Sequence, residues 1–84
     1  MTKILFFGRL RDAAGLAELS CCLPQSLRTV AEVRQWLGAR DPNLGQALAA
    51  PGVRVAVDQT FCASEQACAA GAQEIAFMSP LSGG

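Results

Sequence analysis

The sequence has 84 residues, of which 51% are hydrophobic, and its seven basic and seven acidic side chains cancel. This length predicts one small domain that buries roughly 60% of the surface of its unfolded chain. The charges are scattered along the chain, which argues against partners such as nucleic acid or an anionic membrane. The apolar run from Ile4 to Phe7 is too short for a signal peptide or a membrane span, so we expect a cytoplasmic protein with free thiols at its cysteines.

The first part of the chain predicts two strands. Lys3–Phe7 is rich in strand-forming residues and ends at Gly8. Residues 9–15 have polar flanks and close with a glycine, which predicts a wide loop. An extended pattern resumes at residues 19–23, and its alternation places three side chains on one face: Leu19, Cys21 and Leu23. Cys21 is therefore predicted to be a core residue.

One amphipathic helix is predicted next. Thr29–Glu32 has the pattern of a capping box, in which the threonine hydroxyl and the glutamate carboxylate each accept from the other residue's backbone amide. The apolar stripe that faces the sheet consists of Val30, Val33 and Leu37. We expect the helix to end between residues 38 and 40, before Pro42. Leu44 and Leu48 indicate a further short helical turn, although the glycine between them argues against it.

The remaining elements are a hairpin and a final strand. Val53–Val57 alternates between apolar and polar residues, as a half-buried strand does. Asp58-Gln59 is expected to make a tight reversal into Thr60–Cys62. Glu74–Met78 then forms the last strand, so the order of elements is ββαβ(β)β. With one helix crossing a mixed sheet, this order predicts an α+β protein with the ubiquitin-like β-grasp fold.

The chain continues past the last strand into six residues that end on Gly83-Gly84. Glycine has no Cβ, so a Gly-Gly end can lie extended in a tunnel too narrow for side chains, where a partner's active site closes around the terminal carboxylate. Pro80 ends the hydrogen-bonding ladder of the strand before it. We therefore expect a β-grasp domain over residues 1–78 and an extended tail over residues 79–84. The alternative is an ordinary frayed end.

The two faces of the sheet predict a binding surface. Six residues are expected to face the helix: Ile4, Phe6, Val55, Val57, Ile75 and Phe77. Parity then sends Phe7, Ala56 and Met78 to the opposite face, where Phe61 is able to join them. An apolar patch of this size usually marks a partner site. The alternative is a second small core under a loop.

Other chemistry has little support in the sequence. Cys62 and Cys68 are six apart, Cys21 and Cys22 point in opposite directions, and there is no histidine, so no zinc-binding spacing is present. The glutamates lie in different predicted elements and form no acid–base pair. We therefore predict no metal, no permanently bound cofactor and no self-contained active site.

Several segments resemble the MoaD-type small subunits of molybdopterin synthase, which are ubiquitin-like sulfur carriers. Residues 4–15 match the start of that family, an apolar strand followed by F-x-x-L-R and then a glycine. Residues 55–60 resemble its central hairpin, and residues 71–77 with Gly83-Gly84 resemble its closing strand and tail. The resemblance covers essentially the whole chain. One departure is Ser79, where the family often has a proline, and this departure is expected to loosen the root of the tail slightly.

The resemblance implies that the reacting group is the carboxylate of Gly84, with Gly83 beside it. An ATP-dependent activating enzyme would adenylate this carboxylate, and a sulfur donor protein would convert the transient acyl-adenylate to a thiocarboxylate, giving 1-thioglycine. The tail would then enter the large subunit of a heterotetrameric synthase and donate sulfur to cyclic pyranopterin monophosphate, with two deliveries per dithiolene. Catalytic side chains are expected mainly in the large subunit. Contacts with partners are expected from Phe7, Phe61, Met78, Pro80, Leu81 and Ser82.

Three other functions remain open on the sequence. A sulfur carrier with this sequence could instead deliver its sulfur to thiamine synthesis or tRNA thiolation. A ubiquitin-like modifier would join Gly84 to an amine of a target protein. A plain interaction domain would leave Gly84 as a free carboxylate.

Overall fold

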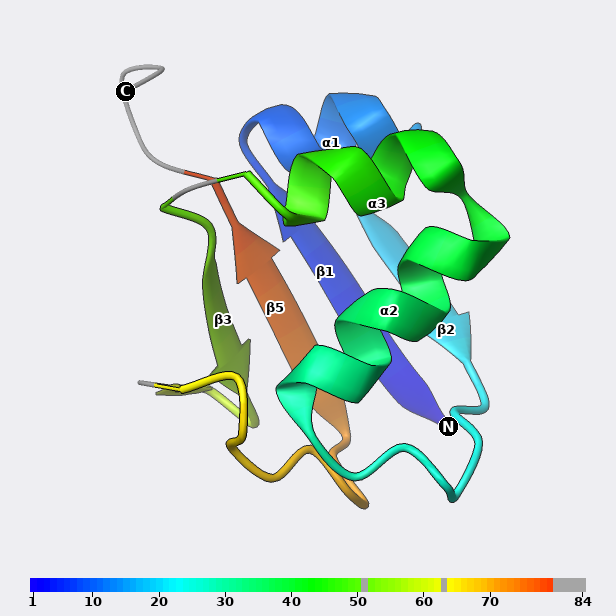
Figure 1. Ribbon diagram of the computed structural model, residues 1–84, viewed down its shortest axis with the longest axis vertical. Helices are drawn as coiled ribbons and strands as arrows, with labels where there is room; N and C mark the ends of the chain where they lie inside the picture. The colour runs from blue at the N-terminus through cyan, green and yellow to red at the C-terminus, as the bar shows by residue number, and fades with distance from the viewer. Residues whose placement is uncertain (51, 63, 80–84) are drawn as a thin grey trace.

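The computed structural model describes residues 1–50, 52–62 and 64–79, and it shows a mixed sheet with helices on one face (Figure 1). The predicted tail residues 80–84 lie outside the described residues. The elements are β1 (Thr2–Phe7), α1 (Arg9–Ala14), β2 (Glu18–Cys21), α2 (Val30–Arg40), α3 (Pro42–Leu48), β3 (Arg54–Val57), β4 (Thr60–Phe61) and β5 (Glu74–Met78). This arrangement confirms the predicted α+β class and β-grasp order.

The sheet has the strand order β2-β1-β5-β3-β4, so the last strand of the chain lies at its centre. β1 and β5 are parallel, and the other neighbouring strands are antiparallel. In the β1–β5 register Phe6 lies beside Phe77, and Phe7 lies beside Met78. The first and last strands of the chain therefore end at the same level.

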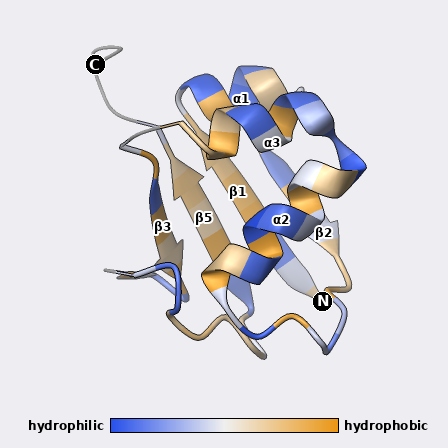
Figure 2. Ribbon diagram, in the orientation of Figure 1, coloured by the Kyte–Doolittle hydropathy of each residue, from blue (hydrophilic) through white to orange (hydrophobic). Residues whose placement is uncertain are grey.

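The core lies between this sheet and the helices. Ile4, Phe6, Ile75 and Phe77 are at most 1% exposed, and the rings of the two phenylalanines stack with centroids 6.2 Å apart. Figure 2 shows apolar residues along the strands under the helices and hydrophilic residues on the outer side of α2. The helices contribute Leu10, Val30, Val33, Leu37, Leu44 and Leu48 to this core. Among the described residues, none of the helices has both the length and the apolar character that a membrane crossing requires.

The predicted wide loop over residues 9–15 is wrong, because the structure forms α1 there. Leu10 is 1% exposed and anchors the helix in the core. Gly15 ends it in the left-handed conformation, with φ 78°, and its amide donates to the carbonyl of Arg11. α1 has only six residues, too few to be stable alone, so tertiary packing determines its conformation. The segment carries only one deeply buried side chain, so the sequence showed no helical period.

The capping box of α2 is confirmed in both directions. Thr29 Oγ1 accepts from the amide of Glu32 at 3.2 Å, and Glu32 Oε1 accepts from the amides of Thr29 and Arg28 at 3.0 and 2.9 Å. α2 ends at Arg40. The side chain of Asp41 then accepts from two amides at the start of α3, and Pro42 occupies the first turn of that helix.

The second helical turn around Leu44 and Leu48 is confirmed as α3, and the glycine within it has a packing role. A Cβ on Gly45 would lie 2.7 Å from Gly38 Cα on α2, closer than real contacts allow. Gly45 therefore allows α2 and α3 to approach each other. Gly45 argued against a helix in the sequence, but the close packing of α3 on α2 requires a glycine at this position.

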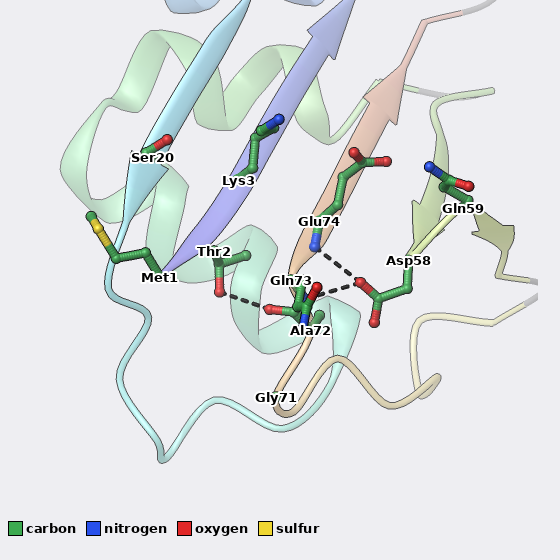
Figure 3. Close-up of a pocket in the computed structure, with 10 residues that line it drawn as sticks. All are labelled: Met1, Thr2, Lys3, Ser20, Asp58, Gln59, Gly71, Ala72, Gln73 and Glu74. Atoms are coloured by element: carbon green, nitrogen blue, oxygen red, sulfur yellow. Dashed lines mark hydrogen bonds between the residues drawn. The ribbon is translucent and has the colours of Figure 1, made fainter.

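The reversal at Asp58-Gln59 is confirmed, and both residues have positive φ values of 48° and 70°, which matches the backbone twist of a two-residue hairpin. The carboxylate of Asp58 accepts from the amides of Gln73 and Glu74 at 2.9 and 3.0 Å, as Figure 3 shows. Thr2 Oγ1 donates to the carbonyl of Ala72 at the same end of the sheet. These hydrogen bonds fix the start of β5.

Candidate functional site

The predicted site divides into a described part and a part outside it. Phe7, Phe61 and Met78 lie among the described residues. The predicted reacting and tail residues lie outside them: Pro80, Leu81, Ser82, Gly83 and Gly84. The described part of the site consists of one face of the sheet and the point where the tail begins.

The first row of the sheet face that points away from the helices contains Phe7 and Met78. They are neighbours in the β1–β5 register, and Arg54 of β3 lies on the other side of Met78. Their chain neighbours Phe6 and Phe77 are buried under the helices, so alternation turns Phe7 and Met78 to the open face. Phe7 is 42% exposed and Met78 is half-buried.

The second row of this face runs across four strands and ends at Phe61. The registers align Leu5 with Ala76, Ala76 with Ala56, and Ala56 with Phe61. Phe61 is 61% exposed, whereas the two alanines are nearly buried. We call these two rows the open-face patch: Leu5, Phe7, Ala56, Phe61, Ala76 and Met78. Exposure of its two aromatic rings favours a partner site over a second small core.

Two members of the open-face patch were missed in the sequence. Leu5 and Ala76 have the same parity in their strands as Phe7 and Met78, so the alternation that placed the predicted residues also identifies these two. Arg54 was missed as well, and it extends the first row with a positive charge. Among the described residues, the only ion pair joins Arg34 to Glu65, so Arg54 has no ion-pair partner there.

The root of the tail is held by a contact that the sequence did not predict. Ser79 Oγ accepts from the amide of Arg9 at 2.9 Å and donates to the carbonyl of Phe7 across 3.4 Å. We expected a serine here to loosen the root, and the structure shows that its hydroxyl ties the chain to the start of α1. This contact lies directly beyond the pair of Phe7 and Met78.

Apart from Cys62, which directly follows Phe61, the cysteines and the surface hollow of Figure 3 lie away from the open-face patch and Ser79. All four cysteines are free thiols. Cys21 was predicted to be a core residue; it is half-buried at the edge of the core, where burial raises the pKa of its thiol. The described residues hold no group of three or more side chains suited to a metal ion. The hollow in Figure 3 is lined by residues such as Lys3, Asp58 and Glu74, and none of the three described site residues Phe7, Phe61 and Met78 lines it. It lies at the end of the sheet opposite Ser79.

Comparison with known proteins places this chain in a family. The model of the ThiS family matches residues 4–84. A search of curated proteins found no match. Among solved structures, SAMP1 from Haloferax volcanii is 24% identical, with a TM-score of 0.76, and the alignment covers 99% of this chain and 98% of that one.

Two further structures have the same fold. A putative molybdopterin converting factor subunit 1 from Pyrococcus furiosus is 21% identical, with a TM-score of 0.74 and coverage of 95% of this chain and 97% of that one. The small archaeal modifier protein 1 from Methanosarcina acetivorans is 23% identical, with a TM-score of 0.72 and coverage of 99% and 95%. The family match and these structures lead to one conclusion: the chain belongs to the ThiS family and shares the ubiquitin-like β-grasp fold of these structures.

Proposed function

We propose that this chain is the sulfur carrier subunit of a molybdopterin synthase, with the carboxylate of Gly84 as the group that carries sulfur. The observation that supports this most strongly is the ThiS family match, which runs through to Gly84. In the fold of the matched residues, the central strand β5 leads directly to Ser79, where the tail begins and where a hydrogen bond holds the chain to the start of α1. The likeness to the putative molybdopterin converting factor subunit from Pyrococcus furiosus favours this pathway.

The proposed chemistry takes place in two steps on the same carboxyl group. An oxygen of the Gly84 carboxylate attacks the α-phosphorus of ATP and releases pyrophosphate, which gives an acyl-adenylate. Hydrosulfide delivered by a donor protein then attacks the carbonyl carbon, AMP leaves with the former carboxylate oxygen, and loss of the proton gives the thiocarboxylate. Activation is needed because a carboxylate resists attack by sulfur, whereas an adenylate is a good leaving group. Because an acyl-adenylate hydrolyses in water, the step requires a closed site in the activating enzyme, which a side-chain-free Gly-Gly end is able to enter.

The open-face patch supplies the proposed docking surface for the large subunit and the activating enzyme. It combines exposed aromatic rings at Phe7 and Phe61 with a methionine, whose flexible side chain adapts to different partners in turn. Its first row lies beside Ser79, so a partner bound there is close to the start of the tail. The thiocarboxylate would then react within the heterotetramer, where the large subunit holds cyclic pyranopterin monophosphate.

Intact mass spectrometry tests this function. The purified chain is incubated with ATP, its activating enzyme and a sulfur source, and its mass is compared with a reaction without ATP. The proposal predicts a mass increase equal to the difference between sulfur and oxygen, confined to the C-terminal peptide. An unchanged mass under conditions that load a known carrier would contradict it.

A second candidate is a ubiquitin-like protein modifier, which the two structures of small archaeal modifier proteins favour. A modifier would leave Gly84 joined to an amine of a target, so the same experiment with cell extract would give conjugates of higher mass. Delivery of sulfur to thiamine or tRNA would give the same thiocarboxylate as the main proposal. Dithiolene formation with the purified large subunit separates these pathways.

A further inference from the structure

The last described residue, Ser79, bridges two segments that lie seventy positions apart in the chain. Its hydroxyl accepts from the amide of Arg9 at 2.9 Å, with a sequence separation of 70, and donates to the carbonyl of Phe7. Met78 and Phe7 are the last paired residues of β5 and β1, so the bridge closes the sheet directly beyond them. The root of the tail is therefore tied to the corner between β1 and α1.

The backbone conformation of Gly8 and its lack of a side chain leave room for this bridge. It is the N-cap of α1 with φ 65° and ψ −135°, and it offers no side chain to the free amides at the start of the helix. Ser79 supplies that hydrogen-bond acceptor from the other end of the chain. A Cβ on Gly8 would collide with Ser79 Oγ, and a positive φ already disfavours other residues there. Gly8 and Ser79 therefore form a matched pair.

We infer that Ser79 is a positioning residue for the tail, because its bridge fixes the point from which the tail starts. This inference rests on the proposed function. Five further residues reach Gly84, and a chain of five residues spans at most roughly 16–18 Å when extended. An anchored root has less conformational freedom to lose when a partner's site takes up the tail. Where the family often has a proline, this chain restricts the root by hydrogen bonds.

Steady-state kinetics of adenylation test the inference, with the full chain as the substrate of its activating enzyme. Ser79→Ala removes the bridge, and we expect the KM for the chain to rise roughly three- to tenfold at an unchanged kcat. The matched control is Thr29→Ala, which also removes a helix cap but lies at the start of α2, away from the end of β5 (Figure 1). Thr29→Ala is expected to leave KM unchanged. Fluorescence of Trp36 verifies that both variants are folded.

Two further measurements separate positioning from a general loss of stability. Hydrogen exchange of the Arg9 amide is expected to accelerate in Ser79→Ala, and Ser79→Thr, which keeps the hydroxyl, is expected to restore both the slow exchange and the KM. The inference is overturned if Ser79→Ala has the KM of the wild type, if Ser79→Thr is no better than Ser79→Ala, or if Thr29→Ala raises KM equally. Failure of the proposed function looks different, because the wild-type chain itself would then not be adenylated.

Discussion

Neighbouring phenylalanines in β1 have opposite roles because they point to opposite faces of the sheet. Phe6 is 1% exposed and stacks on Phe77, whereas Phe7 is 42% exposed beside Met78. The two residues are chemically identical, so their energetic roles depend only on their position in the strand. Phe6 stabilises the fold, and Phe7 is available to a partner.

Substitution of this pair separates stability from binding. We expect Phe7→Ala to lower the free energy of unfolding by less than about 1 kcal/mol, because much of its ring is already in water. The matched control Phe6→Ala should cost about 3–5 kcal/mol, because it leaves a cavity in the core. Phe7→Ala, like Met78→Asp, should reduce the yield of large subunit in a pull-down. A large drop in melting temperature for Phe7→Ala would show that the ring belongs to the core.

At the scale of elements, the cap of α2 is the clearest link between local sequence and stability. Thr29→Ala removes the oxygen that accepts from the amide of Glu32, and we expect a loss of about 1 kcal/mol. Trp36 lies in the same helix and is the only tryptophan, so its fluorescence follows denaturant unfolding. The denaturation midpoint should fall while sulfur loading is retained. If the midpoint did not change, the hydrogen bond would contribute nothing to stability.

The same cap predicts a dependence of stability on pH. Hydrogen bonds from the amides of Arg28 and Thr29 hold the pKa of Glu32 below its ordinary value of 4.5. The folded pKa is lower than the unfolded one, so this contribution is fully present above the unfolded pKa and is lost as pH falls through the folded pKa. The stability difference between wild type and Glu32→Gln should therefore shrink on acidification below that ordinary value. A difference that stays constant down to the acid limit of folding would contradict the assignment.

The elements that the sequence predicted are those whose signals are local. The capping box of α2 lies within four residues, and β3 has a strict alternation, so both were placed correctly. α1 was missed because six residues with one buried leucine carry no period, and contacts such as that of Asn43 Nδ2 with the carbonyl of Ala13 hold it in place. Its conformation depends on packing against α3, which no local pattern reveals.

At the scale of the whole molecule, the two ends of the sheet differ. One end is closed by the hydrogen bonds of Asp58 and Thr2, while the other carries Phe7, Met78 and the bridge of Ser79. The sequence predicted the exposed residues of the open-face patch, because strand parity assigns side chains to faces. It did not predict the Ser79 bridge, because that contact joins residues from opposite ends of the chain. The parallel pairing of β1 with β5 brings these residues together.

The proposed sulfur transfer places a strict length requirement on the tail. Reacting atoms must come within about 3–3.5 Å, and one extended residue moves the carboxylate by roughly 3.3–3.6 Å. Addition of one residue after Gly84, or deletion of Gly84, is therefore expected to abolish sulfur transfer while the fold and the binding of the large subunit remain. Gly83→Val and Gly84→Val keep the length but add a branched Cβ, which should block a narrow channel.

Intact mass spectrometry of these tail variants, after reaction with ATP, activating enzyme and a sulfur source, tests the central claim most directly. The account predicts that the wild-type chain exchanges one oxygen for sulfur and supports dithiolene formation with the large subunit. None of the variants should do either, although Trp36 fluorescence should report a native fold in each. If the chain extended beyond Gly84 acquired sulfur at its new terminus and still made the dithiolene product, the carboxylate of Gly84 would have no special role.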